Sequence, residues 1–195
     1  MPVPLILASS SPRRRLLLEQ AGYPFEVDPS NYQEPAPAPG VPVAEYVADL
    51  AWRKAREVAI RRGSGLILGA DTSCAAGGEI LNKPVGRADA ERMLRLQEGT
   101  DTEVVTGVCL YRADLDLWVG FADRSVCRCR VLTDDERSRY LDSGLWEGKA
   151  GAYGLQDDDP FVSVASGSWS SVVGLPVERL AAVLREFPRL TAATG

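Results

Sequence analysis

The chain has 195 residues and contains no histidine. This absence excludes the serine–histidine and cysteine–histidine nucleophilic mechanisms, and it removes the commonest ligand of catalytic zinc. Any catalysis must therefore depend on carboxylates, lysine and arginine, and we expect a hard metal ion to assist them.

Cysteine is scarce, and its four residues form no C-x-x-C pair: Cys74, Cys109, Cys127 and Cys129. Without histidine or that spacing, a zinc site is a weak interpretation. We expect buried, reduced thiols instead, as is usual for a protein of the cytoplasm.

Long apolar runs are also missing: none reaches the ~18 residues of a membrane span, and the first residues do not match a signal peptide. There is no G-x-x-x-x-G-K-[ST] stretch for a P-loop. The net charge of −5 argues against general binding to nucleic acid, which favours a basic surface. Length and composition predict one globular domain, or two closely joined lobes, over residues 1–195. The reduced thiols predict a cytoplasmic location.

The most informative stretch is residues 3–28, which predicts a strand, a serine-rich turn and a helix. Ser11 suits the N-cap, Pro12 the first helical position and Gly22 the end of the helix. Arg13–Arg15 then fall in the first turn, where each cation opposes the helix dipole by roughly 0.3–1 kcal/mol. A phosphate bound at the helix N-terminus would remove that conflict, so we predict a phosphate-binding helix start. A solvated basic turn is the alternative.

Two further charged residues in the first third of the chain are candidate site residues. Lys54 lies in the apolar stripe of a predicted helix over residues 43–62, between Val47 and Val58. Because lysine is rarely buried without a partner, it should reach into an anion-lined cleft, or else extend along the surface. Glu34 is the one carboxylate between the prolines of a loop, which makes it a candidate site residue; an exposed loop position without function is the alternative.

The apolar run Leu66–Ala70 predicts a central strand, with Asp71 and Thr72 at its carboxyl end. Open α/β sheets bind ligands at that edge. Gly77-Gly78 predicts a hairpin that returns Lys83 towards Asp71. An aspartate after a strand is also a common turn former, so a catalytic site and a simple turn both remain open here.

The rest of the chain predicts alternating elements: helices over 88–98, 133–141 and 176–187, and strands over 103–112, 116–131, 161–165 and 171–173. Between them, Gln156 can hydrogen-bond a base edge or a neighbouring loop. Asp157–Asp159 predicts a solvated acidic turn, with metal binding as the alternative.

Six short motifs occur in order along almost the whole chain: ASSSPRR, RKA, GADT, NKP, KAGAYGLQ and SVVGLP. In this order and spacing the sequence resembles the Maf-like nucleotide pyrophosphatases. The resemblance implies an α/β fold with a curved mixed β-sheet flanked by helices, and two lobes around a cleft. It also implies hydrolysis of a nucleoside triphosphate to the monophosphate and pyrophosphate, assisted by a divalent metal cation, Mg²⁺ or Mn²⁺.

The resemblance also implies residue roles. Asp71 matches the proton acceptor, and Glu34 matches the acidic residue of the loop. Asp71 would accept the proton of water or hold the metal that activates it, and the sequence does not separate these roles. Glu34 would be the second carboxylate at the metal, because a hard cation prefers oxygen ligands. The phosphate-handling positions match Ser9, Arg13, Arg14, Lys54 and Lys83.

At Arg13, Thr72 and Gln156 this chain resembles the family branch that acts on dTTP and UTP. Modified pyrimidine nucleotides are further candidate substrates. The branch acting on 7-methyl-GTP has tryptophan in place of Arg13. One departure concerns base recognition: Asp157-Asp158-Asp159 replaces the family's glycine-rich continuation.

Two other functions stay open at this point. The first is a non-catalytic nucleotide-binding regulator of cell division that uses the same pocket. The second is a nucleic-acid-binding protein that uses Arg13–Arg15, against which the acidic composition argues. The sequence leaves the oligomeric state open, and a homodimer is one of the alternatives.

Overall fold

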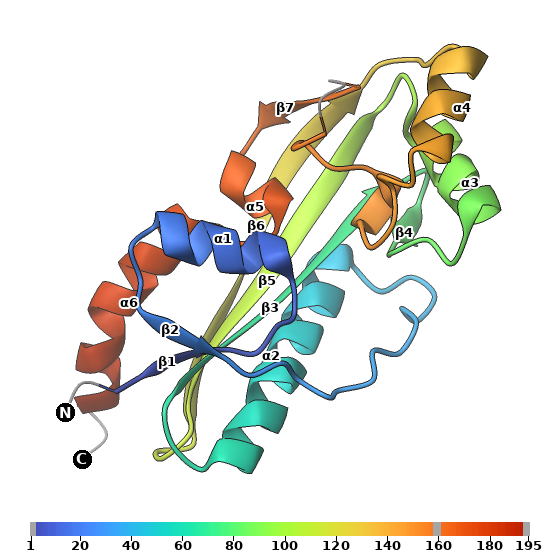
Figure 1. Ribbon diagram of the computed structural model, residues 1–195. Coiled ribbons are helices and arrows are strands. Elements are labelled where there is room, and N and C mark those ends of the chain that lie inside the picture. Colours follow the sequence, from blue (N-terminus) through green and yellow to red (C-terminus); the bar gives the residue numbers. More distant parts are fainter. Residues whose placement is uncertain (1–2, 158–160, 193–195) are drawn as a thin grey trace.

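The computed structural model describes residues 3–157 and 161–192, with side chains up to Phe187 (Figure 1). Seven strands form one sheet: β1 (Leu5–Leu7), β2 (Phe25–Val27), β3 (Leu66–Ala76), β4 (Glu79–Leu81), β5 (Asp101–Arg112), β6 (Leu117–Cys129) and β7 (Val162–Ser166). Their order is β2-β1-β3-β5-β6-β7. Strand β4 pairs with β3 along the same edge as β1, further along the strand. The first three pairings in that path are parallel, parallel and antiparallel, so the predicted mixed sheet is confirmed.

The helices are α1 (Pro12–Gln20), α2 (Val43–Arg62), α3 (Arg87–Gln97), α4 (Asp134–Asp142), α5 (Trp169–Val173) and α6 (Val177–Ala192), with a short 3-10 turn η1 (Ala150–Ala152). The predicted bounds of α2 are confirmed, and so is the hairpin from β3 to β4. No helix in the described ranges is long and apolar enough to cross a membrane.

Helices cover both faces of the sheet (Figure 1). On one face, α2 packs its buried alanines against Ile67 and Cys109. On the other, α1 and α6 bury Leu18 and Leu180 against Leu68 of β3. Helices α3 and α4 form a third cluster around the far ends of the long strands. The two ends of the sheet therefore have separate cores, joined by β3, β5 and β6.

Helix α2 lies very close to the sheet because β3 and β5 carry glycines beneath it. A Cβ atom on Gly69 would lie 2.2 Å from the carbonyl oxygen of Ala51, and one on Gly107 would lie 2.3 Å from that of Val47. Real Cβ atoms do not approach so closely, so only glycine permits this packing. The close approach brings side chains of α2 within reach of β3.

One edge of β3 is open in its middle. It pairs with β1 at Leu66–Leu68 and with β4 at Cys74–Ala76, so residues 69–73 have neither partner on that side. On the other side the ladder with β5 is continuous from Leu66 to Ala75. The prediction that Asp71 follows the end of a strand is therefore wrong. It lies inside a longer strand, at the point where the parallel neighbour has ended.

A second correction concerns residues 171–173, which are helical and not a closing strand. The side chain of Ser168 caps this short helix by accepting a hydrogen bond from the backbone N–H of Ser171, at 3.0 Å. Gly174, at φ 129°, ends it. Adjacent valines favoured a strand, but the serine cap and the terminal glycine decide the local conformation.

Candidate active site

A cavity of about 390 Å³ lies beside the open edge of β3. Its volume is within the range of small-molecule sites. Every site residue predicted from the sequence lines it: Ser9, Arg13, Arg14, Glu34, Lys54, Asp71, Thr72, Lys83 and Gln156. Residues from distant parts of the chain thus meet in one hollow.

Lys54 is the centre of the charged cluster. Its Nζ lies 2.5 Å from Oδ1 of Asp71 and 2.6 Å from Oε1 of Glu34. Lys54 and Asp71 are only 7% and 6% exposed. The prediction that Lys54 reaches an anion-lined cleft is confirmed, and the surface alternative is wrong.

The two carboxylates differ in environment. Burial raises the pKa of Asp71 above its ordinary value, and the charges of Lys54 and Arg14 oppose this only in part. Burial also acts to raise the pKa of Glu34, but its bond to Lys54 and the charges of Lys54, Lys83 and Arg14 outweigh burial and lower it. A carboxylate with a raised pKa is the better proton acceptor of the two.

A hydrogen-bond chain from α2 fixes the loops that carry Glu34 and Lys83. The hydroxyl of Tyr46 donates to the carbonyl oxygen of Pro35 at 2.9 Å and accepts from the Asn82 amide at 3.0 Å. Asn82 also accepts from the hydroxyl of Ser73 at 2.8 Å. No sequence pattern marks Tyr46 for this role, because its contacts depend on three segments meeting in space.

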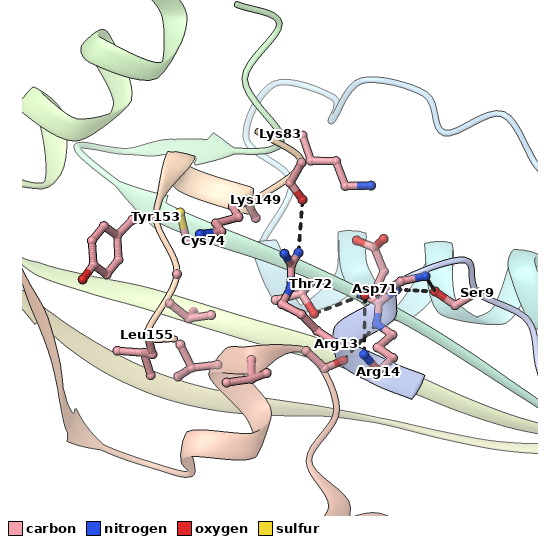
Figure 2. A pocket seen from close by; sticks show the side chains of 18 of the residues that line it. Ser9, Arg13, Arg14, Asp71, Thr72, Cys74, Lys83, Lys149, Tyr153 and Leu155 are labelled. Atoms are coloured by element: carbon pink, nitrogen blue, oxygen red, sulfur yellow. Dashed lines mark hydrogen bonds between the residues drawn. The ribbon is translucent and has the colours of Figure 1, made fainter. Parts of the chain in front are cut away.

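Arg14 joins the start of α1 to the sheet. Its guanidinium donates to Oγ of Ser9 at 3.1 Å, to Oγ1 of Thr72 at 3.2 Å and to the carbonyl oxygen of Gly174 at 2.9 Å (Figure 2). Ser11 caps α1 through its hydroxyl, as predicted. Burial lowers the pKa of Arg14, an effect that the charge of Asp71 opposes. Arginine remains cationic nonetheless, so an anion binding here would meet a fixed positive charge.

Arg13 points to the opposite wall, where it donates to the carbonyl oxygen of Gly148 at 3.1 Å. In that wall Asp157 forms an ion pair with Lys149 and accepts from Tyr140 at 2.7 Å. Its side chain is only 5% exposed, so Asp157 is not part of a solvated turn. Asp158 and Asp159 lie outside the described residues. Gln156 is exposed at the rim of the cavity.

The fit of the site to a metal ion depends on Asp71 and Glu34. Among the described residues, no three acidic or cysteine side chains gather as a complete set of metal ligands. Two carboxylate oxygens do lie within 2.6 Å of the same ammonium nitrogen. Mg²⁺ is commonly held by one or two carboxylates together with substrate phosphates. The donor set therefore fits a cation that arrives with a phosphorylated substrate.

The family model described as "Maf-like protein" matches residues 4–187. The chain belongs to the Maf-like protein family. Its relatives include a dTTP/UTP pyrophosphatase of Rhodopirellula baltica, 46% identical over 95% of this chain and 83% of the relative. Those of Salinibacter ruber and Symbiobacterium thermophilum bear the same name. The Salinibacter ruber protein is 45% identical over 93% of this chain and 90% of the relative. The Symbiobacterium thermophilum protein is 42% identical over 98% of both chains.

In this Maf-like chain the cavity also extends to residues that sequence analysis missed. Beyond Cys74 it is lined by Gln97, Thr102, Val104 and Cys127. Gln97 ends α3, whereas Thr102 and Val104 lie on β5 and Cys127 lies on β6. Because side chains alternate along a strand, the sequence predicts that Thr102 and Val104 share a face, but no motif marks that face as part of a site.

Proposed function

We propose that this chain is a nucleoside triphosphate pyrophosphatase that hydrolyses dTTP and UTP to the monophosphate and pyrophosphate. Membership of the Maf-like family and the names of three relatives support this activity. The observation that carries the proposal is the Lys54, Asp71 and Glu34 cluster, which shares one cavity with the basic start of α1.

The proposed division of roles follows from the chemistry of the groups. Cleavage between the α- and β-phosphates needs a positioned water and cations around the phosphate oxygens. Asp71 accepts the proton of that water. Arg13 and Arg14 bind phosphate oxygens through paired N–H groups, and Lys54 and Lys83 act as point charges.

The proposed cofactor is Mg²⁺ or Mn²⁺, held by Asp71 and Glu34 together with the phosphates. When bound, such a cation neutralises charge on the phosphate oxygens and lowers the pKa of bound water. Ser9 contributes to the phosphate site through its hydroxyl, which already accepts from Arg14. Thr72 and Gln156 remain predicted contacts of the substrate.

We also propose a cytoplasmic location, which is supported by four free, buried cysteines. A homodimer and the single domain stay predictions. The proposed partner is the nucleotide itself, with neither nucleic acid nor membrane as a partner.

The decisive experiment replaces Asp71 with Asn, which retains its shape and removes the proton acceptor. We expect kcat for UTP to fall by about 10²–10⁴-fold, the usual effect of losing a general base. Pyrophosphate, orthophosphate and monophosphate should be quantified separately in the presence of Mg²⁺ or Mn²⁺. The matched control is Asp49→Asn on the surface of α2, where turnover should be unchanged.

Near-normal turnover in Asp71→Asn would remove Asp71 from catalysis. Release of orthophosphate would show that another bond is cut. Tight binding of UTP by the unmodified protein without any turnover would instead favour the non-catalytic nucleotide-binding regulator.

A further inference from the structure

The cavity residues Gln97, Thr102 and Cys127 form what we call its inner end. Several strand residues separate this end from the charged cluster around Lys54. Thr72 of β3 contacts Thr106 of β5 through their hydroxyls, 2.9 Å apart, next to Arg14. Thr102 lies on the same face of β5, four residues away, or about 13 Å along the strand. Figure 2 shows the same separation, with Cys74 and Tyr153 at one side and Ser9, Arg14 and Asp71 at the other. A nucleotide whose phosphates meet Arg14 would extend its base towards Thr102.

Gln97 presents a fixed hydrogen-bond acceptor at this inner end. Its Nε2 donates to the carbonyl oxygens of Met93 at 2.9 Å and Gly151 at 2.7 Å. The opposite orientation of the amide would set its oxygen against both carbonyls, so the contacts determine which atom is which. The side-chain oxygen is left with the Cys74 thiol, a weak donor 4.0 Å away that lies closer to the carbonyl oxygen of Leu81, at 3.6 Å.

Thr102 adds a second polar group, a buried hydroxyl. The residue is 2% exposed and lines the cavity, and its Oγ1 has no hydrogen-bond partner among the described residues. Buried polar atoms are nearly always hydrogen-bonded, so an orphan beside a cavity points to a ligand. The cavity residues that follow Thr102 on its strand or lie on the paired strand are apolar or weakly polar: Val104, Cys127 and Cys129.

We propose that Gln97 and Thr102 read the hydrogen-bonding edge of the base and select uracil or thymine over cytosine. This inference rests on the proposed function. Uracil and thymine present an N3–H donor between two carbonyl acceptors. The Gln97 oxygen accepts from N3–H, and the Thr102 hydroxyl donates to an adjacent carbonyl. Cytosine instead presents a bare N3 acceptor, which opposes the Gln97 oxygen.

The same contacts explain how one site can take both dTTP and UTP. Thymine differs from uracil by a methyl group on C5, which is not part of the edge that the two side chains read. Gln156 is exposed at the rim, whereas Gln97 is 6% exposed and fixed by two carbonyls. A fixed, desolvated acceptor discriminates more strongly than a solvent-exposed one, because a mismatched base leaves it unpaired.

The test compares kcat/KM for UTP, CTP and 3-methyl-UTP, in which a methyl group blocks N3. The unmodified enzyme should prefer UTP over both by about 10²-fold or more. Gln97→Leu should lower kcat/KM for UTP at least about tenfold and leave the value for CTP nearly unchanged. Thr102→Val, which keeps the shape, should lower kcat/KM for UTP about tenfold. Gln20→Leu, on the exposed end of α1, is the matched control and should change neither value.

A merely structural role of Gln97 would lower the values for all three nucleotides equally. Unchanged UTP-to-CTP ratios in both variants would therefore overturn the inference while leaving the enzyme assignment intact. Inhibition by inorganic tripolyphosphate, which has no base, reports binding at the phosphate end of the cavity and should be the same in all variants.

If no nucleotide is hydrolysed, the proposed function fails. Equal equilibrium binding of UMP and CMP by the unmodified chain would then overturn the base-reading inference as well.

Discussion

Lys54 compensates the negative charge of a buried carboxylate within the protein itself. Asp71 and Glu34 both contact its Nζ, and Asp71 is almost fully buried. Removing one partner of a buried ion pair leaves the other charge uncompensated, which costs far more than the pair itself contributes. The stability of the empty protein should therefore depend on Lys54.

Lys54→Met should lower the free energy of unfolding by about 3–5 kcal/mol, because the Asp71 carboxylate is then buried without a partner. The double variant Lys54→Met/Asp71→Asn should recover part of that loss, since asparagine carries no charge. Urea denaturation of both variants measures the difference. Arg53→Met, at the exposed neighbouring position, is the control and should change stability little. A double variant no more stable than Lys54→Met would show that the charge of Asp71 is not the cause.

Among the elements, α2 and β3 bring the site together. Lys54 comes from the helix and Asp71 from the strand, and their contact requires the helix to lie almost on the sheet. Gly69 and Gly107 permit that approach. The sequence predicted the helix from its apolar stripe, but nothing in it predicted which glycines would lie beneath the helix.

Gly107→Ala should push α2 away from the sheet. Overpacking of this kind costs roughly 1–3 kcal/mol of stability. It should also lower kcat/KM for UTP, because Lys54 and Asp71 separate. The matched control is Gly86→Ala, where the backbone is extended at φ 172° and a Cβ meets nothing within 4 Å. Thermal unfolding and kinetics of both variants test this, and full activity in Gly107→Ala would show that the close approach is not required.

Across the whole molecule, the two ends of the sheet have their own apolar clusters but share their longest strands. Leu68 of β3 belongs to one cluster and Cys74 of the same strand to the other. β5 is shared in the same way, through Leu110 and Val104. Shared strands couple the unfolding of the two ends, so we propose that the chain folds as one unit.

Thermal unfolding should accordingly show one transition, with the same midpoint by tryptophan fluorescence and by far-ultraviolet circular dichroism. Trp52 reports one end of the sheet and Trp146 the other. A non-hydrolysable dTTP analogue with a methylene bridge between the α- and β-phosphates should raise that midpoint. At 100 times its Kd it stabilises by about 2.7 kcal/mol. Two separate transitions would contradict the single folding unit.

The sequence by itself determined the chemistry available to this protein and most of its elements. The absence of histidine restricted catalysis to carboxylates and cations, and apolar periodicity placed α2 correctly. Ordered motifs predicted a set of residues that do line one cavity. These features are local, so residue type and spacing are enough to predict them.

Only the tertiary structure decided how far β3 extends, what Lys54 contacts and that Gln97 and Thr102 line the same cavity. The length of β3 depends on its long ladder with β5, which is a non-local pairing. The positions of Gln97 and Thr102 depend on the end of one helix meeting the start of a strand and on strand register. Such contacts arise from packing between distant segments, and no short stretch of sequence encodes them.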